Sequence, residues 1–180
     1  MQPLDEIIRG RRSIRRFEKR EVESEKLTAL LESARWAPSW GNNQCWQFIV
    51  IQDREQKEKL AETLSKKNPA TLSVLDAPVV FAICAESKKS GYYNGQQITR
   101  YQDWLMFDLG LATQNICLTA HSLGLGSVIV GSFDHEVAEK VLCIPKGYEI
   151  VALLPLGYPA HAPSAPKRKE SRIFVHYGHF

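Results

Sequence analysis

Four short apolar runs, each about the length of a β-strand, alternate along the chain with stretches whose apolar residues recur at helical spacing. The runs are WQFIVIQ at 46–52, PVVFAICA at 78–85, SVIVG at 127–131 and EIVALLPLG at 149–157. Short apolar runs bounded by turn residues are typical of buried strands. Strands separated by helices predict an α+β fold in which helices flank one central sheet.

Helical patterns fill the intervals between these runs. Ser24 is expected to cap a helix that buries one apolar face and ends before Pro38. Further helices are expected at 3–9, 53–67, 103–123 and 134–142. The charged 53–67 helix should be exposed, whereas the 103–123 helix is apolar nearly all round and should be enclosed by the protein until Gly124 ends it.

A chain of 180 residues suits a single domain, 1–180, in which about 158–180 form a C-terminal arm. The arm begins with a proline-rich linker and contains RIFVHY, which is a candidate extra strand. A segment that can reach away from its own body is suited to wrap around a partner subunit.

Cysteine spacing and hydropathy exclude several classes of protein. Cys45, Cys84, Cys117 and Cys143 form no Cys-x-x-Cys pair, which argues against zinc sites and thioredoxin-like centres, so no metal is expected. They are interpreted as buried thiols of a reducing compartment. Neither a signal peptide nor a membrane-spanning apolar run is visible, and we therefore expect a cytoplasmic protein without membrane association.

Basic residues gather at both ends of the chain, although the net charge is only +3. The segment RRSIRRF at 11–17 brings guanidinium groups and a hydroxyl together, and KRK at 167–169 forms a second cluster. Arginine forks match phosphate oxygens in bidentate geometry, so the first cluster is a candidate anion site. The alternative is a solvated basic face. The near-neutral chain lacks the broad basic surface of a nucleic-acid-binding protein, and no such partner is expected.

The segment PSWGNNQ at 38–44 is a candidate ligand-binding loop. It offers hydroxyl and amide groups, a glycine that lets another backbone approach, and tryptophans at 36, 40 and 46 in or beside it. These groups suit a ligand that is flat, apolar in body and polar at its edges. The alternative is a helix-to-strand turn whose tryptophans belong to the core.

Taken in order, these segments resemble the nitroreductase family. The resemblance rests on RRSIRRF at 11–17, APSWGNNQCW at 37–46, GLG at 124–126 with VGSF at 130–133, and KRK at 167–169 ahead of VHY at 175–177. It implies a nitroreductase-like α+β fold with a mixed, mostly antiparallel central sheet. It also implies a homodimer in which the C-terminal tail is swapped onto the partner subunit.

The resemblance further implies one FMN at each of two sites in the dimer interface. The phosphate, ribityl chain and pyrimidine edge would be contacted by Arg11, Arg12, Ser13 and Arg15. The other chain would contribute Pro38, Ser39, Trp40, Asn42 and Gln44. The phosphate would also be reached by Lys167, Arg168 and Lys169. Val130 and Gly131 would lie against the flavin ring, with the backbone N–H of Gly131 directed at N5.

In the chemistry that the resemblance implies, FMN itself carries the hydride, so no catalytic side chain is assigned. Arg15 is the cation expected near N1 and C2=O, where positive charge stabilises the reduced flavin. The histidines at 121, 135 and 161 have no acidic residue at a spacing that would indicate a catalytic pair, so no catalytic histidine is assigned.

Some positions depart from the family pattern. Cys45 stands where the family commonly has proline before tryptophan, so a slightly different loop path is expected. Residues 68–75, NPATLSVL, offer no assignable contact to the flavin. An insertion around 90–104 falls where family members build a variable wall over the flavin, and its candidate acceptor-pocket residues are Tyr92, Tyr93 and Trp104, with Tyr101 nearby. The alternative is an exposed loop that packs its own aromatic side chains.

The implied function is a ping-pong oxidoreductase that uses NAD(P)H to reduce nitroaromatics, quinones or similar flat small-molecule acceptors. One alternative is a reduced-flavin enzyme of the same family with another reaction. Another is a flavin-binding protein without rapid turnover, which stores FMN or carries electrons to a protein partner. The sequence contains no βαβ dinucleotide fingerprint, so it does not decide between NADH and NADPH.

Overall fold

The computed structural model of the chain describes residues 3–101 and 103–180. At its centre lies an antiparallel sheet of four strands, β1 (Trp46–Ile51), β2 (Val79–Glu86), β5 (Gly126–Ser127) and β6 (Tyr148–Gly157). Their order is β1-β2-β6-β5, so β1 and β5 form the two edges. A separate hairpin pairs β3 (Tyr92–Tyr93) with β4 (Gln96–Gln97). The expected α+β fold with one central, mostly antiparallel sheet is confirmed.

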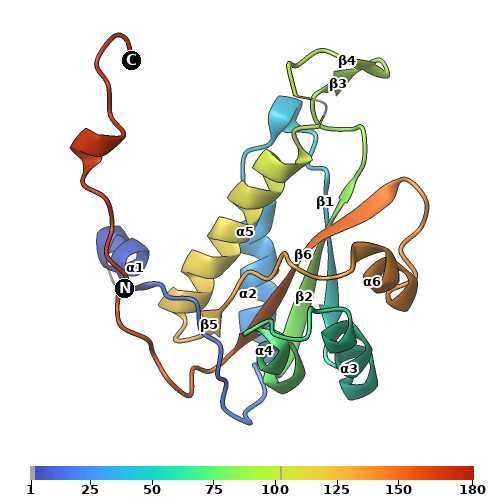
Figure 1. The fold of residues 1–180 in the computed structure, drawn as a ribbon, viewed down its shortest axis with the longest axis vertical. Helices are drawn as coiled ribbons and strands as arrows, with labels where there is room; N and C mark the ends of the chain where they lie inside the picture. The colour runs from blue at the N-terminus through green and yellow to red at the C-terminus, as the bar shows by residue number, and fades with distance from the viewer. Residues whose placement is uncertain (1–2, 102) are drawn as a thin grey trace.

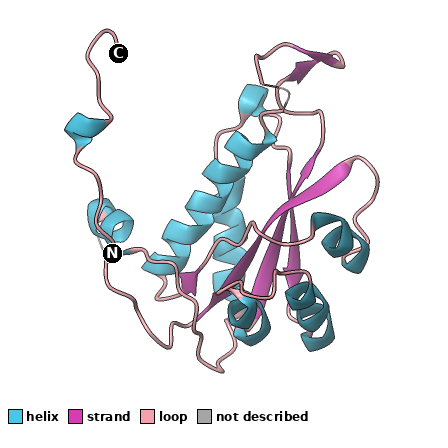
Figure 2. Cartoon of the chain, in the orientation of Figure 1, coloured by secondary structure: helices cyan, strands magenta, loops and turns pink. Residues whose placement is uncertain are grey.

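Helices cover both faces of the sheet (Figures 1 and 2). On one face lie α2 (Ser24–Arg35) and α5 (Leu105–Ser122). On the other lie α3 (Arg54–Glu62), α4 (Thr71–Asp76) and α6 (His135–Val141). The short α1 (Leu4–Gly10) lies beside the C-terminal part of α5. No helix in the described part of the chain is both long and apolar enough to cross a bilayer.

Strand β2 divides the core into two clusters because successive side chains of a strand point to opposite faces. Phe81, Ile83 and their odd-numbered neighbours pack against α2 and α5. Val80, Ala82 and Cys84 pack against α3, α4 and α6. All of β2 except Glu86 is buried, as the continuous apolar run predicts for a central strand.

Helix ends follow local capping chemistry. The Asp53 and Asp134 carboxylates accept the backbone N–H groups of Gln56 and Val137 at the starts of α3 and α6. Helix α5 ends in a Schellman motif, in which Leu125 N–H donates to the Ala120 carbonyl and Gly124 has φ of 75°. The predicted cap at Ser24 is wrong: Ser24 is the first helical residue and Glu23 precedes it, with a side chain that is hydrogen-bonded elsewhere.

Several expected elements differ in extent. Within SVIVG only Ser127 belongs to the short β5. Val128 N–H donates to the Pro155 carbonyl at 3.3 Å, and Val130 forms an isolated bridge with Leu153. RIFVHY does not form a strand; it overlaps the 3₁₀ helix η2 (Ser171–Ile173) in an exposed arm. The 68–75 region contains α4, which was not expected.

Burial also differs from expectation at several places. Strand β1 is only half-buried because it lies at a sheet edge. Helix α3 is amphipathic and buries Leu60, and α5 leaves Met106 and Phe107 about 60% exposed. Of the four free cysteines, Cys143 is exposed and the other three are buried.

Candidate functional site

The arginine-rich segment is fastened to the sheet by its apolar residue. Ile14 is buried, and its backbone N–H donates to the Ser127 carbonyl on β5 at 2.9 Å. A Cβ on Gly126 would meet the Ile14 side chain at 2.4 Å, so glycine is required there for this close approach. With Ile14 directed inward, Arg15 is exposed and Ser13 is half-buried. The segment therefore presents its polar side chains outward from a fixed backbone.

The two basic ends of the chain meet at one cavity of about 280 Å³. Its lining residues are Arg11, Arg12, Ser13, Arg15, Pro163, Ser164, Pro166 and Arg168. Of the three basic residues predicted in the arm, Arg168 lines this cavity, whereas Lys167 and Lys169 are not among the residues that form its wall. The structure thus brings together four N-terminal residues and one C-terminal residue that were predicted to contact FMN.

Backbone contacts hold Arg12 and its neighbours in place. The Arg12 guanidinium donates to the Arg9 carbonyl, and to the Arg11 carbonyl at 2.9 Å. The His121 ring on α5 closes against Gly10, where a Cβ would meet Nε2 at 2.4 Å. Burial lowers the pKa of His121, and the charges of Arg11 and Arg12 lower it further. A neutral imidazole at this position avoids repulsion with the arginines.

Residues of the 68–75 region fix two of the predicted site segments, a role that the sequence analysis missed. The buried Ser73 hydroxyl donates to the Arg15 carbonyl at 3.2 Å. The Asn68 amide donates to the Ser132 carbonyl at 2.9 Å, next to Gly131. An asparagine followed by a short apolar pattern was the available signal, but only the tertiary structure shows which backbone groups it reaches.

Val130 and Gly131 have different environments. Val130 is buried in the core and exchanges both backbone hydrogen bonds with Leu153 at 2.9 Å. The Val130 side chain is directed away from solvent, so Val130 holds this segment against β6. Gly131 is exposed, and among the described residues its N–H has no protein acceptor. The Gly131 amide is therefore free to donate to a ligand.

The 38–44 loop is a strained turn. It contains the 3₁₀ helix η1 (Trp40–Asn42) and three residues with left-handed backbone, Gly41, Asn42 and Gln44. The Ser39 hydroxyl accepts the Gln44 N–H at 2.9 Å, and the Gln44 amide donates to the Asn42 side chain at 3.2 Å. Non-glycine residues in this region cost free energy and mark functional loops when the surroundings hold them in place.

Buried Asp108 on α5 holds this loop, and the sequence analysis did not identify it. Its carboxylate accepts the Trp40 N–H at 3.0 Å and the Ser90 hydroxyl at 2.6 Å. The Cys45 thiol lies 3.7 Å from the same carboxylate. Burial, and then the negative charge of Asp108, raise the pKa of Cys45 to about 12. Cys45 is therefore a protonated hydrogen-bond donor at this point.

The insertion forms a second cavity, of about 380 Å³, lined by Tyr101, Asp103, Trp104, Met106 and Phe107. Trp104 and Phe107 contact edge to face at a centroid distance of 5.3 Å. Of the three predicted acceptor-pocket residues, Trp104 lines this cavity. Tyr92 and Tyr93 do not belong to this lining; they form β3 of the small hairpin.

The two groups of predicted residues lie at opposite ends of α5. The 38–44 loop and the aromatic cavity adjoin Asp108 and its neighbours in the first turns of α5, whereas Arg11 and Arg12 adjoin Cys117 and His121 near its last turn. From Asp108 to His121 the helix rises about 20 Å. In Figure 1, η1 and the N-terminal segment are correspondingly far apart.

Comparison with known proteins decides the family. The model of the nitroreductase family matches residues 8–158 of the chain. The chain belongs to the nitroreductase family. The match extends from the arginine-rich segment to the end of β6 and includes the loop at 38–44 and the VGSF segment.

Relatives and solved structures agree with this membership. The nitroreductase-family chain is 35% identical, over 88% of its length and 78% of the relative's, to a protein of Methanothermobacter thermautotrophicus named for NADH dehydrogenase and NAD(P)H nitroreductase. A nitroreductase family protein of Clostridium novyi NT superposes with a TM-score of 0.78 at 30% identity, covering 88% of this chain and 86% of that one. An FMN-dependent nitroreductase of Clostridium difficile R20291 gives 0.80 at 27% identity, covering 97% and 98%.

Proposed function

We propose that the protein is an FMN-dependent oxidoreductase that takes reducing equivalents from NAD(P)H and passes them to a flat acceptor such as a nitroaromatic or a quinone. The observation that carries this proposal is the cavity at which Arg11, Arg12 and Arg15 meet Arg168. The family is one of oxidoreductases by the names of its members, and one solved relative is named as FMN-dependent.

The donor set of this cavity fits the phosphate of FMN. Four arginines and two serines line a space of about 280 Å³, and no carboxylate is among the lining residues. Among the described residues, none of these four arginines forms an ion pair within 4 Å. An uncompensated group of guanidinium donors favours a dianion with several oxygens.

The separation along α5 supports a site shared between two chains. We propose that the arginine cluster of one subunit and the 38–44 loop of its partner contact the same FMN, because within one chain they lie at opposite ends of a long helix. Exposed apolar side chains are available for such an interface, among them Leu4 and Ile8 on one face of α1 and Met106 and Phe107 on α5. Apolar surfaces of this kind mark interaction sites.

The C-terminal arm supports the same assembly. It extends away from the body of its own subunit (Figure 1). Its residues beyond 160 are almost all exposed, and they include Ile173, Phe174 and Tyr177. Among the described residues, no strand pairs with the outer edge of β1. We propose that the arm packs on the partner subunit, where an unpaired strand edge and apolar groups are available to it.

Bound FMN would supply the two-electron chemistry that the side chains lack. The protein's own residues would bind and orient it. Arg15 would place a positive charge beside the pyrimidine edge, and the free N–H of Gly131 would donate a hydrogen bond to the ring. Trp104 and Phe107 would form an apolar wall for the nicotinamide and the acceptor, which enter in turn. No side chain is required as a nucleophile.

Anaerobic reduction of the purified protein tests this function. The released cofactor should be FMN by chromatography after denaturation, and NADH or NADPH should bleach the bound flavin within seconds. A quinone or a nitroaromatic should then restore the oxidised spectrum. Bound flavin that neither nicotinamide reduces would instead indicate a flavin store or a carrier of electrons to a protein partner. A protein that binds no flavin would contradict the proposal.

A further inference from the structure

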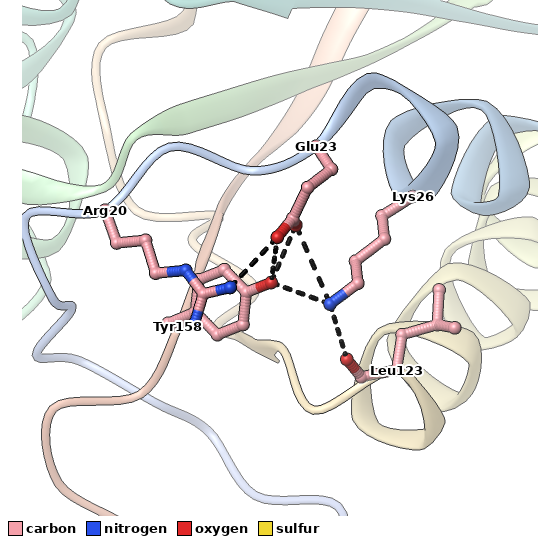
Figure 3. Close-up of polar contacts among 5 residues, drawn as sticks. All are labelled: Arg20, Glu23, Lys26, Leu123 and Tyr158. Atoms are coloured by element: carbon pink, nitrogen blue, oxygen red, sulfur yellow. Dashed lines mark hydrogen bonds and ion pairs between the residues drawn. The ribbon is translucent and has the colours of Figure 1, made fainter.

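Tyr158 is the point at which the C-terminal arm leaves the body of the protein. It follows the last residue of β6, and it is buried, whereas no residue after it is buried. Its hydroxyl accepts a hydrogen bond from the Lys26 ammonium at 2.6 Å and donates to the Glu23 carboxylate, whose oxygens lie at 2.6 and 2.8 Å (Figure 3). One phenol therefore lies between a cation and an anion.

The same cluster includes two further residues, Leu123 and Arg20. The Lys26 ammonium also donates to the Leu123 carbonyl at 3.2 Å, at the end of α5. The Arg20 guanidinium lies 3.7 Å from the centroid of the Tyr158 ring and donates to Glu23 at 3.0 Å. Figure 3 shows Arg20 stacked on the ring with Glu23 above it. The hydrogen bond from Tyr158 is the largest of several contacts, those of Arg20 and Lys26 among them, that together lower the pKa of Glu23 to about 2.

Backbone pairing next to Tyr158 sets the path of the arm. Glu18 N–H donates to the Tyr158 carbonyl at 2.9 Å, and Ala160 N–H donates to the Arg16 carbonyl at 3.0 Å. The arm therefore starts antiparallel to the arginine-rich segment and continues along it until Arg168 reaches the cavity of Arg11–Arg15. Prolines at 159, 163 and 166 restrict the backbone between these two points.

We propose that Tyr158 is a positioning residue for the phosphate site: its side-chain contacts with Glu23 and Lys26 fix the register in which the arm pairs with residues 16–18, and this register places Arg168 beside Arg11 and Arg15. The inference rests on the proposed FMN site. A slip of the pairing would carry Arg168 along the segment and away from the cavity, although every residue of the cavity would still be present. Tyr158 would thus affect FMN affinity only through Arg168.

A double-mutant cycle on FMN affinity tests this dependence. FMN dissociation from the purified flavoprotein is followed by the recovery of free-flavin fluorescence on dilution, for the parent, Tyr158→Phe, Arg168→Ala and the double variant. Tyr158→Phe should raise the FMN Kd by about threefold to tenfold in the parent, since it removes hydrogen bonds to two charged groups. In the Arg168→Ala background it should change the Kd by less than about twofold, because coupled residues do not contribute additively.

Two controls separate positioning from a loss of stability. Tyr148→Phe removes a hydroxyl at the opposite end of β6, and it should leave the Kd unchanged. Glu23→Gln keeps the size of the side chain to which Tyr158 donates but removes its charge. If Tyr158→Phe fails to fold, Glu23→Gln takes its place in the double-mutant cycle with Arg168→Ala. The midpoint potential of the bound flavin should remain that of the parent in Tyr158→Phe, because Arg15 is unaltered.

Three other outcomes would contradict either the role of Tyr158 or the assignment of Arg168 to the phosphate. If Tyr158→Phe weakens FMN equally in both backgrounds, Tyr158 does not act through Arg168 and the inference fails while the phosphate site stands. The inference alone also fails if Tyr158→Phe leaves FMN affinity unchanged. If Arg168→Ala has no effect on FMN affinity, the assignment of Arg168 to the phosphate fails and removes the basis of the inference.

Discussion

Arg15 and Arg168 line the same cavity, yet their substitution should have different consequences. If Arg15 faces the pyrimidine edge, Arg15→Ala removes a charge that matters most once the flavin is reduced. The midpoint potential should fall and reduction should slow, while FMN is largely retained. Arg168→Ala removes a phosphate contact present in both redox states and should weaken FMN binding by about 1 to 3 kcal/mol. Titration of FMN and potentiometry of both variants measure these effects.

The control for this pair is Arg172→Ala, because Arg172 is an exposed residue of the same arm that pairs with Glu170 at 2.7 Å. It should change neither affinity nor potential. If instead Arg15→Ala loses FMN with an unchanged potential and Arg168→Ala shifts the potential, the roles of the two arginines are reversed.

Asp108 is the residue on which the 38–44 loop depends most. Asp108→Ala leaves the Trp40 N–H and the Ser90 hydroxyl without their buried acceptor, which should destabilise the protein by roughly 2 to 4 kcal/mol. Asp108→Asn retains an acceptor oxygen and should cost less. Urea unfolding of both variants measures the difference. Equal stability of Asp108→Ala and the parent would show that the loop does not depend on this carboxylate.

The clustering of Arg11, Arg12 and Arg15 could be predicted because these residues are close neighbours within RRSIRRF, whereas their contact with a phosphate stays a prediction. Asp108, Asn68 and Ser73 could not be predicted in the same way. Each acts through a hydrogen bond to a residue far away in the sequence, and a single acid or amide within a helical pattern carries no signal of its partner. Tyr92 and Tyr93 were predicted in the acceptor pocket from the place of the insertion in the family pattern; they form β3 and are not among the residues that line the cavity at Trp104.

At the scale of elements, the apolar runs predicted β2 and β6 well because both strands are central and buried on both faces. The edges of the sheet were harder to predict. SVIVG has the composition of a strand, but only its first residue, Ser127, pairs in β5, together with the preceding Gly126. RIFVHY likewise has a strand pattern without a partner strand in its own chain, which is consistent with the proposed packing of the arm on a second subunit.

Truncation of the arm tests that packing. Removal of residues 170–180 deletes exposed apolar side chains that contact no core of their own subunit, so the monomer should keep its thermal stability. The dimer should dissociate at a higher protein concentration than the parent dimer does, because interface area is lost. Analytical ultracentrifugation over a range of concentrations measures this shift. An unchanged dimer would show that the arm does not take part in assembly.

At the scale of the whole molecule, the central proposal is that each FMN site draws its arginines from one chain and its 38–44 loop from the other. The positions of the two segments at opposite ends of α5 motivate it. A homodimer then carries two equivalent sites, and neither subunit alone contains a complete one.

Mixed dimers test this statement most directly. One chain carries Arg11→Ala and Arg168→Ala, the other carries Ser39→Ala and Asn42→Ala, and differently tagged subunits are co-purified. If each site is shared, one site of the mixed dimer contains all four changes and the other contains none. The account predicts one FMN per mixed dimer with the affinity of the parent, while both variant homodimers bind FMN weakly. A mixed dimer in which both sites are weakened, with no site of parental affinity, would contradict it.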